Sequence, residues 1–271
     1  MRQRLGGLAR SIVVPAAVFA LWEGLSRGGA ISPVILPAPS QVALRWWQYL
    51  LPLQPYDGTG GRLAWMFSGE LPQDVIGSLS RVLAGFVIGA GVALPLGLLM
   101  GRIRLVHDLM SPVLEIVRPI PPIAFIPLSM LWFGLGNPPA LFLISLGAFF
   151  PVLVNTIAGV RNVDAIYVRA AQNLGAGEAT LFRRIILPAA MPHILTGVRV
   201  GIGVAFIGVI VAEMTAVNMG LGYRILEARE FMWSDKIIAG MITIGLCGLG
   251  IDIGMNRLNR WLLRWQRGLE S

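Results

Sequence analysis

The sequence has few of the residues from which disulfides, metal sites and phosphate-binding loops are built. Its one cysteine, Cys247, excludes a disulfide within the chain. Two histidines, His107 and His193, are too few for a multi-histidine metal site. The single lysine, Lys236, follows an aspartate, so the Gly-Lys-Ser/Thr step of a P-loop is missing. We therefore predict no ATP hydrolysis, no cofactor and no metal in this chain.

Charged residues are also scarce. They make up 13% of the chain, whereas a soluble domain has about 25%. Hydrophobic residues reach 55%, and the mean hydropathy is +0.71. This composition predicts a polytopic membrane protein. The net charge of +8 could suggest nucleic-acid binding, but the arginines cluster in loops beside apolar runs, as membrane topology requires. We therefore predict contact with lipid and no contact with nucleic acid.

Six apolar runs predict an all-α membrane protein with about six transmembrane helices. These runs cover residues 11–26, 74–100, 109–133, 140–160, 194–216 and 237–255. The first run, behind three arginines, also fits a signal peptide, but no small-x-small cleavage site follows, so we favour a retained anchor. The predicted organisation is a tail and anchor (1–27), an extracytoplasmic loop (28–73), a transmembrane domain (74–260) and a cytoplasmic tail (261–271).

The distribution of basic residues predicts the orientation. Thirteen of the 22 lie in the N-terminus, the 102–104 loop, the loop between spans four and five, and the C-terminus, against six in the opposite loops. The positive-inside rule then places both termini and the 164–188 loop in the cytoplasm of a bacterial cell, with the chain in its inner membrane.

The 164–188 loop, DAIYVRAAQNLGAGEATLFRRIILP, is predicted to contain a short amphipathic helix. Asp164 is a suitable N-cap, and Ile166, Ala170 and Leu174 recur at helical spacing. Gly175 follows where a C-terminal cap is expected, and Pro188 is expected to interrupt the chain before the next apolar run. A helix with an apolar face, held between two spans, is suited to docking on another protein.

The loop resembles the EAA loop of ABC importer permeases, E-A-A-x3-G-x9-I-x-L-P. The matching residues are Ala170, Ala171, Gly175, Ile185, Leu187 and Pro188. Arg169 stands where the pattern has its leading Glu. Two further stretches, RPIPPIAFIPLSMLWFGLG (118–136) and ILTGVRVGIGVAFIGVIVAEM (194–214), resemble the branch that imports taurine, alkanesulfonates, nitrate or bicarbonate.

The resemblance implies a permease subunit of a type I ABC importer, with 164–188 as a cytoplasmic coupling helix. The coupling residues would be Arg169 and the six matching positions just given. It further implies a second permease copy, two cytoplasmic ATPase subunits that bind ATP and Mg²⁺, and an extracytoplasmic solute-binding protein. The expected solute is a small oxyanion; an aromatic vitamin precursor is the alternative.

Four charged residues lie within apolar runs: Arg81, Glu115, Arg118 and Glu213. A charge at mid-bilayer costs about 2.5 to 3.5 kcal/mol, so each is expected to face protein or water. Glu115 and Arg118, three residues apart, are predicted to pair on one helix face and brace a proline kink at 118–122. Arg81 or Arg118 could instead attract an anion.

Pro121 and Phe125, at this kink, are further candidates for the translocation path. Phe125, Trp132, Phe133 and Phe206 are candidate gate residues, although an aromatic stripe more often reflects helix packing.

Three other functions remain open. An ion-coupled secondary transporter would use intramembrane carboxylates as ion sites and would need no docking helix. An intramembrane Ser–His enzyme is disfavoured because neither histidine lies in a predicted span. A channel is disfavoured because no ring of charge or filter-like segment is present.

Overall fold

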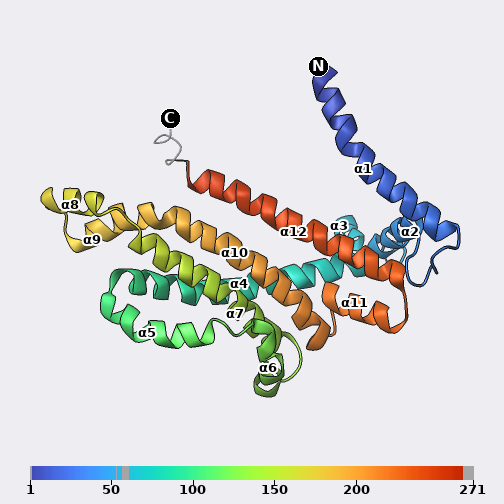
Figure 1. Cartoon of the computed structure of the whole chain (residues 1–271). Coiled ribbons are helices and arrows are strands. Elements are labelled where there is room, and N and C mark those ends of the chain that lie inside the picture. The colour runs from blue at the N-terminus through green and yellow to red at the C-terminus, as the bar shows by residue number, and fades with distance from the viewer. Residues whose placement is uncertain (1, 53, 57–60, 265–271) are drawn as a thin grey trace. The chain divides into compact units, whose positions relative to one another are not determined.

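The fold of the chain was analysed in a computed structural model, which describes residues 2–52, 54–56 and 61–264 (Figure 1). The helices are α1 (Arg2–Arg27), α2 (Pro39–Leu50), α3 (Arg62–Met66), α4 (Glu70–Arg102), α5 (Arg104–Val117), α6 (Ile126–Phe133), α7 (Asn137–Arg161), α8 (Ala165–Asn173), α9 (Glu178–Leu181), α10 (Leu187–Thr215), α11 (Leu221–Glu230) and α12 (Ser234–Leu262). A 3₁₀ turn (Pro122–Phe125) precedes α6, and a π turn (Phe182–Ile186) precedes α10. The described residues contain no strand, as predicted for an all-α protein.

The chain divides into two compact units. The first comprises Met1–Ile76 and Tyr223–Leu246, and the second comprises Gly77–Gly222 and Cys247–Ser271. The second unit contains α5 to α10, most of α4 and the C-terminal half of α12.

Four helical segments of the described chain are long and apolar enough to cross a membrane: 70–102, 137–161, 178–215 and 234–262. The helices on either side of residues 118–121 add a fifth span, which is bent by 81° at this break. The remaining predicted span, 11–26, lies within α1, a continuous helix of 26 residues. The count of about six spans is therefore consistent with the fold.

The break in the third span lies where the prolines predict it. Arg118 is the last residue with helical geometry in α5, and Pro121 is extended at φ −60° and ψ 138°. Pro119, Pro121 and Pro122 lack the backbone N–H groups that would continue the helix, so the span restarts as a 3₁₀ turn. Irregular backbone at membrane depth must line a cavity or be buried in protein.

The core of the second unit lies where α7 packs against α4 and α10. Ala93, Val152, Leu153, Ala205 and Val209 are almost fully buried there. Glycines on one face of α4 allow this packing, because an added Cβ would lie within 3 Å of α7 at four positions: Gly85, Gly89, Gly97 and Gly101. Small residues let two helix backbones approach closely in a bilayer, where burial of apolar surface does not drive association.

Gly89 gives a sharp test of this contact. A Cβ at Gly89 would lie 2.2 Å from the carbonyl oxygen of Ser145, so Gly89→Ala must separate α4 from α7. We expect a loss of about 1 to 3 kcal/mol in stability, the usual range for overpacking. Thermal unfolding in detergent measures it, with Gly91→Ala as the control, because a Cβ at Gly91 meets nothing within 4 Å. Equal melting temperatures for the two variants would contradict the close contact.

The first unit is held together by polar contacts of α2. Tyr49 donates a hydrogen bond to Asp74 at 2.5 Å, and Asp74 also binds Arg224 of α11 at 2.8 Å. Trp46 donates to Thr243 of α12 at 2.9 Å. Burial of Tyr49, followed by the neighbouring Asp74 carboxylate, raises the pKa of this phenol well above its usual value. The hydroxyl therefore stays protonated and keeps donating to Asp74.

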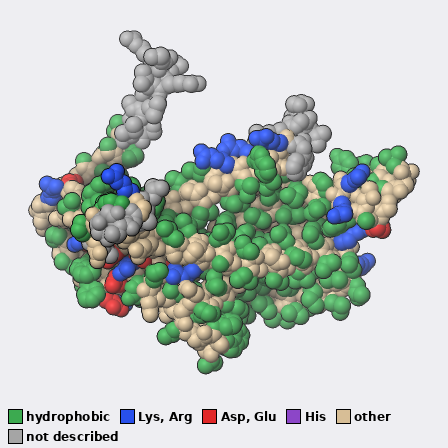
Figure 2. Space-filling view, turned by 180° about the vertical axis from the view of Figure 1, so that it is seen from behind, with side chains coloured by type: hydrophobic (Ala, Val, Ile, Leu, Met, Phe, Trp, Pro, Cys, Tyr) green, Lys and Arg blue, Asp and Glu red, His purple; other side chains and the backbone are tan. Residues whose placement is uncertain are grey.

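The surface of the long helices is largely apolar. Figure 2 shows hydrophobic side chains over the second unit, with one group of Lys and Arg side chains at the end that carries α8 and α9 and another along the upper edge. Exposed arginines at this end include Arg169, Arg183 and Arg184. An apolar belt next to a basic end is typical of a helix bundle in a membrane with a cytoplasmic loop.

Candidate functional site

The predicted docking helix is α8, and its two ends have the predicted caps. Asp164 accepts a hydrogen bond from the backbone N–H of Ile166 at 2.9 Å, which satisfies one free donor of the first turn. At the other end Gly175 has φ +79°, a left-handed conformation that favours glycine. The N–H groups of Gly175 and Ala176 donate to carbonyls of Gln172 and Ala171, which closes the helix.

Two sides of α8 have different surroundings. Val168 and Ala171 pack against the buried cluster formed by Val160, Leu181, Ile186, Ala190 and Ile194. Ile166, Tyr167 and Leu174 are 69%, 62% and 88% exposed. One side therefore anchors the helix to the ends of α7 and α10, and the other offers apolar side chains that this chain leaves uncovered.

The residues of the EAA-like pattern divide between these two surroundings. Ala171, Ile185 and Leu187 pack on the buried cluster, and Pro188 is half-buried. Arg169, Ala170 and Gly175 are exposed. Within the described part of the chain Arg169 forms no ion pair, while the nearby Glu178 pairs with Arg102 at the end of α4.

Pro188 does not interrupt the chain, contrary to the prediction. Residues 178–215 form one continuous helical segment, so the fifth span begins well before residue 194. The π turn Phe182–Ile186 accounts for this, because the N–H of Leu187 bonds to Phe182, five residues back. This widened turn changes the hydrogen-bond register just before Pro188, which has no N–H to contribute.

Arg81 and Glu213, two of the charges expected to face protein or water, pair with each other inside the second unit. The Arg81 guanidinium lies 2.6 Å from Glu213 Oε1, and its Nε donates to the side chain of Asn137 at 2.8 Å. The two residues are 8% and 0% exposed. The charge of Arg81 is thus neutralised, which makes it a poor attractor for an incoming anion.

Glu213 also accepts a hydrogen bond from the first turn of α11 (Leu221–Glu230). Its Oε2 accepts hydrogen bonds from Ser78 Oγ at 2.9 Å and from the backbone N–H of Gly222 at 3.0 Å. Ser78 Oγ in turn accepts from the N–H of Leu221. Gly220, at φ +125°, packs so closely on the carboxylate that a Cβ would lie 2.4 Å from it. We call the buried Ser78, Arg81 and Glu213, together with the exposed Asn137, the ion-pair network.

Sequence reasoning found the two charges of this network but not their partnership. They are 132 residues apart, and no sequence spacing connects Ser78 or Asn137 with Glu213. The one available signal was the pair of opposite charges in separate apolar runs, since intramembrane charges commonly pair with each other.

Glu115 and Arg118 do not pair, contrary to the prediction. Neither forms an ion pair with any residue that the structure describes, and both are exposed. The backbone stays helical through Arg118, whose N–H bonds to Leu114, so the spacing permits an i, i+3 pair that the side chains do not form. Arg118 instead lines a cavity of about 360 Å³ between the broken span, α7 and α10, together with Asn155 and otherwise apolar residues.

The aromatic gate candidates of the third span form a packed cluster. The rings of Phe125, Trp132 and Phe133 lie 6.4, 5.9 and 5.6 Å from that of Phe142 on α7. Phe206 is buried, with 8% exposure. These contacts favour the helix-packing interpretation. Pro121 lines an apolar cavity of about 220 Å³ with Ile126 and Leu143.

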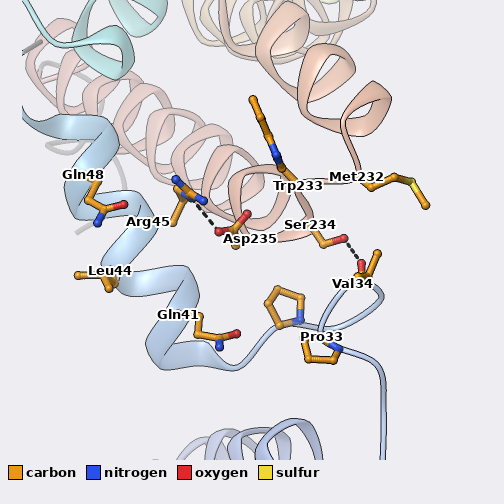
Figure 3. Close-up of a pocket in the computed structure, with 11 residues that line it drawn as sticks. Pro33, Val34, Gln41, Leu44, Arg45, Gln48, Met232, Trp233, Ser234 and Asp235 are labelled. Atoms are coloured by element: carbon orange, nitrogen blue, oxygen red, sulfur yellow. Dashed lines mark hydrogen bonds and ion pairs between the residues drawn. The ribbon is translucent and has the colours of Figure 1, made fainter. Parts of the chain in front are cut away.

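The first unit has its own pocket, of about 490 Å³, between the 33–37 segment, α2 and the start of α12 (Figure 3). In it Arg45 binds Asp235 at 2.8 Å, and Ser234 donates to the backbone oxygen of Val34. An adjoining pocket contains Lys236, which pairs with Glu70 at 3.1 Å and lies 5.1 Å from the centre of the Tyr49 ring. The charged side chains of both pockets thus have partners.

Comparison with known proteins assigns the family. Residues 93–268 match the model of the binding-protein-dependent transport system inner membrane component. The chain belongs to this family, and it is a multi-pass permease of the ABC importer class. The predicted resemblance to the permeases of ABC importers is confirmed.

Relatives cover nearly the whole chain. It is 40% identical over 96% of its length to a putative ABC transporter permease of Methanocaldococcus jannaschii, covering 93% of that protein. It is 35% identical over its full length to the putative aliphatic sulfonates permease SsuC of Bacillus subtilis, covering 92% of it. It is 34% identical over 94% of its length to the taurine permease TauC of Escherichia coli, covering 89% of it.

The fold is also that of a solved transporter. A structure of the MetNI methionine ABC transporter in an inward-facing conformation aligns with a TM-score of 0.61 at 18% identity, covering 70% of this chain and 94% of that one. At this identity the likeness shows the fold alone.

Proposed function

We propose that the chain imports a small oxyanion, such as a sulfonate, nitrate or bicarbonate, using ATP hydrolysed by partner subunits. The observation that carries this proposal is the geometry of α8. Its exposed face of Ile166, Tyr167 and Leu174 would enter a cleft on an ATPase subunit, while Val168 and Ala171 transmit the movement to the ends of α7 and α10.

The proposed assembly has two permease copies, two ATPase subunits and one extracytoplasmic binding protein. Both termini and α8 would lie in the cytoplasm, in keeping with the excess of arginine on that side. ATP and Mg²⁺ would be bound by the ATPase subunits, with no cofactor in the permease. The binding protein would deliver the solute to the opposite side.

The substrate class is supported by the relatives and by one side chain. The permeases SsuC and TauC, which this chain resembles, are named for aliphatic sulfonates and taurine, and a Synechocystis relative is named for nitrate import at 32% identity. In this chain Arg118 lines a cavity with its charge unpaired by any described residue. An unpaired guanidinium in an apolar setting favours an anionic ligand.

Uptake into proteoliposomes tests the energy source. The permease would be reconstituted with its ATPase and binding protein, and uptake of labelled sulfonate, taurine and nitrate measured with ATP inside or with an ion gradient alone. We expect uptake of an anion that requires ATP and survives an ionophore. Uptake that collapses with the gradient and ignores ATP would favour an ion-coupled secondary transporter instead.

A further inference from the structure

The cavity at Arg118 is one end of a longer groove in the second unit. It shares Pro122, Gly147 and Val204 with the apolar cavity that extends to Ile126 and Val211. We call these two cavities together the Arg118 groove. Its polar end has a volume of about 360 Å³ and its apolar end about 220 Å³. The groove thus changes along its length from a cationic to a purely apolar lining.

The polar end is suited to an anionic head group. Arg118 is the one charged residue of the lining and has five N–H donors with no partner among the described residues. Asn155 uses one amide hydrogen on the carbonyl of Pro151 at 2.8 Å and keeps a second for a ligand. Neither end is lined by Asp or Glu, so a ligand's ammonium group would find no carboxylate.

The apolar end is suited to the tail of the same ligand. Ile123 and Ile207 line it and are 55% and 68% exposed, so this chain leaves more than half of each residue uncovered. At Gly208 an added Cβ would meet only the backbone of Ile144, at 3.9 Å, so there is open space beside this residue. Burial of hydrocarbon there is favourable in proportion to the area covered.

The position of the groove fits a transport path. α5 rises roughly 20 Å from Arg104 to Val117, so along the membrane normal it would carry Arg118 deep into a hydrocarbon layer of about 30 Å. A lipid chain in the groove would leave this guanidinium without an anion, which is costly at that depth. The broken backbone at 118–121 also needs a cavity beside it.

We infer that the Arg118 groove selects organic anions that carry one acidic head group and an apolar tail. Arg118 and Asn155 bind the head group, and the wall around Ile123, Leu143 and Gly208 packs on the tail. This inference rests on the proposed function and narrows it: nitrate lacks the tail, and a zwitterion such as taurine carries an ammonium that the groove does not match. The permease then adds a selection step after delivery of the solute.

Direct binding to the permease–ATPase complex in nanodiscs tests the groove without ATP or binding protein. Equilibrium dialysis would compare nitrate, ethanesulfonate and hexanesulfonate, with empty nanodiscs to subtract partition into lipid. We expect hexanesulfonate to bind more tightly than ethanesulfonate, by up to about fourfold for every added methylene that is buried. Arg118→Gln should weaken both sulfonates about tenfold or more, since a charge-assisted contact is lost. Arg104→Gln should not, because Arg104 is 91% exposed at the start of α5.

Substitutions at two glycines of α10 distinguish a loss of tail binding from general damage to the fold. Gly208→Leu fills the apolar end, so it should weaken hexanesulfonate and spare ethanesulfonate. Gly203→Leu should spare both, because a Cβ at Gly203 meets nothing within 4 Å and the residue lies outside the groove lining.

Unchanged binding in Arg118→Gln, or nitrate binding as tight as hexanesulfonate, would overturn the inference. A chain-length preference that survives Gly208→Leu would also overturn it and would point to lipid or to a second permease copy in the apolar end. If the binding results contradict the inference about the groove while ATP-driven uptake persists, the proposed function stands. If uptake ignores ATP, the proposed function fails whatever the binding result.

Discussion

Glu213→Ala is expected to be among the most destabilising single substitutions in the chain. It leaves the Arg81 guanidinium, 8% exposed, without its carboxylate, and it frees the N–H of Gly222 at the start of α11. Removing one partner of a buried ion pair costs about 3 to 5 kcal/mol, because the remaining charge is not solvated. Thermal unfolding in detergent should show a large drop in melting temperature.

A second ion pair supplies the control for this prediction. Arg199 and Asp252 join α10 to α12 at the same distance of 2.6 Å, but their side chains are 45% and 47% exposed. Exposed pairs contribute about 0 to 1 kcal/mol, so Asp252→Ala should change the melting temperature little. The double variant Arg81→Ala/Glu213→Ala should lose less stability than the sum of the losses in the two single variants, because neither charge is then left without its partner. Equal drops in melting temperature for Glu213→Ala and Asp252→Ala would contradict the claim that burial makes the Arg81–Glu213 pair more important for stability.

Leu174→Asp is expected to abolish ATP-driven uptake while leaving the fold intact. Leu174 is 88% exposed at the end of α8, so a charge there disturbs no packing within the chain. It would, however, place a carboxylate in the apolar contact that we propose with the ATPase. Central apolar residues of an interface contribute about 2 kcal/mol or more, so uptake should fall more than about tenfold.

The control is the same substitution at another highly exposed leucine, at the opposite end of α7. Leu135 is 73% exposed in the turn before α7, whereas α8 follows the other end of that helix. Leu135→Asp should keep uptake, and both variants should melt like the wild type. Normal uptake by Leu174→Asp would remove α8 from the coupling mechanism.

Much of the fold could be predicted because local signals decide it. Hydropathy located the spans, the prolines at 119, 121 and 122 located the break, and Asp164 and Gly175 located the ends of α8. These features depend on neighbouring residues alone. The continuous helix through Pro188 was missed because a π turn depends on how Leu181 and Ile186 pack on the ends of α7 and α10.

Side-chain partnerships were predicted less well because they depend on tertiary contacts. Residues three apart on a helix, such as Glu115 and Arg118, can reach each other, but both side chains are exposed and Arg118 lines a cavity instead. Arg81 instead finds Glu213 across two helices of the folded unit, which no sequence spacing indicates. The predicted pair of Glu115 and Arg118 is therefore replaced by a buried pair of Arg81 and Glu213, and Arg118 has no ion-pair partner among the described residues.

Co-purification tests most directly the proposal that α8 couples this permease to an ATPase. The tagged chain would be expressed with the products of its neighbouring genes, extracted in mild detergent and compared as wild type, Gly175→Val and Gly177→Val. Valine is strained at Gly175, which has φ +79°, and comfortable at Gly177, which has φ −72° and ψ 163°. We expect an ATPase subunit with the wild type and with Gly177→Val, and its loss from Gly175→Val. Absence of any ATPase from the wild-type preparation, or its full retention by Gly175→Val, would contradict the proposal.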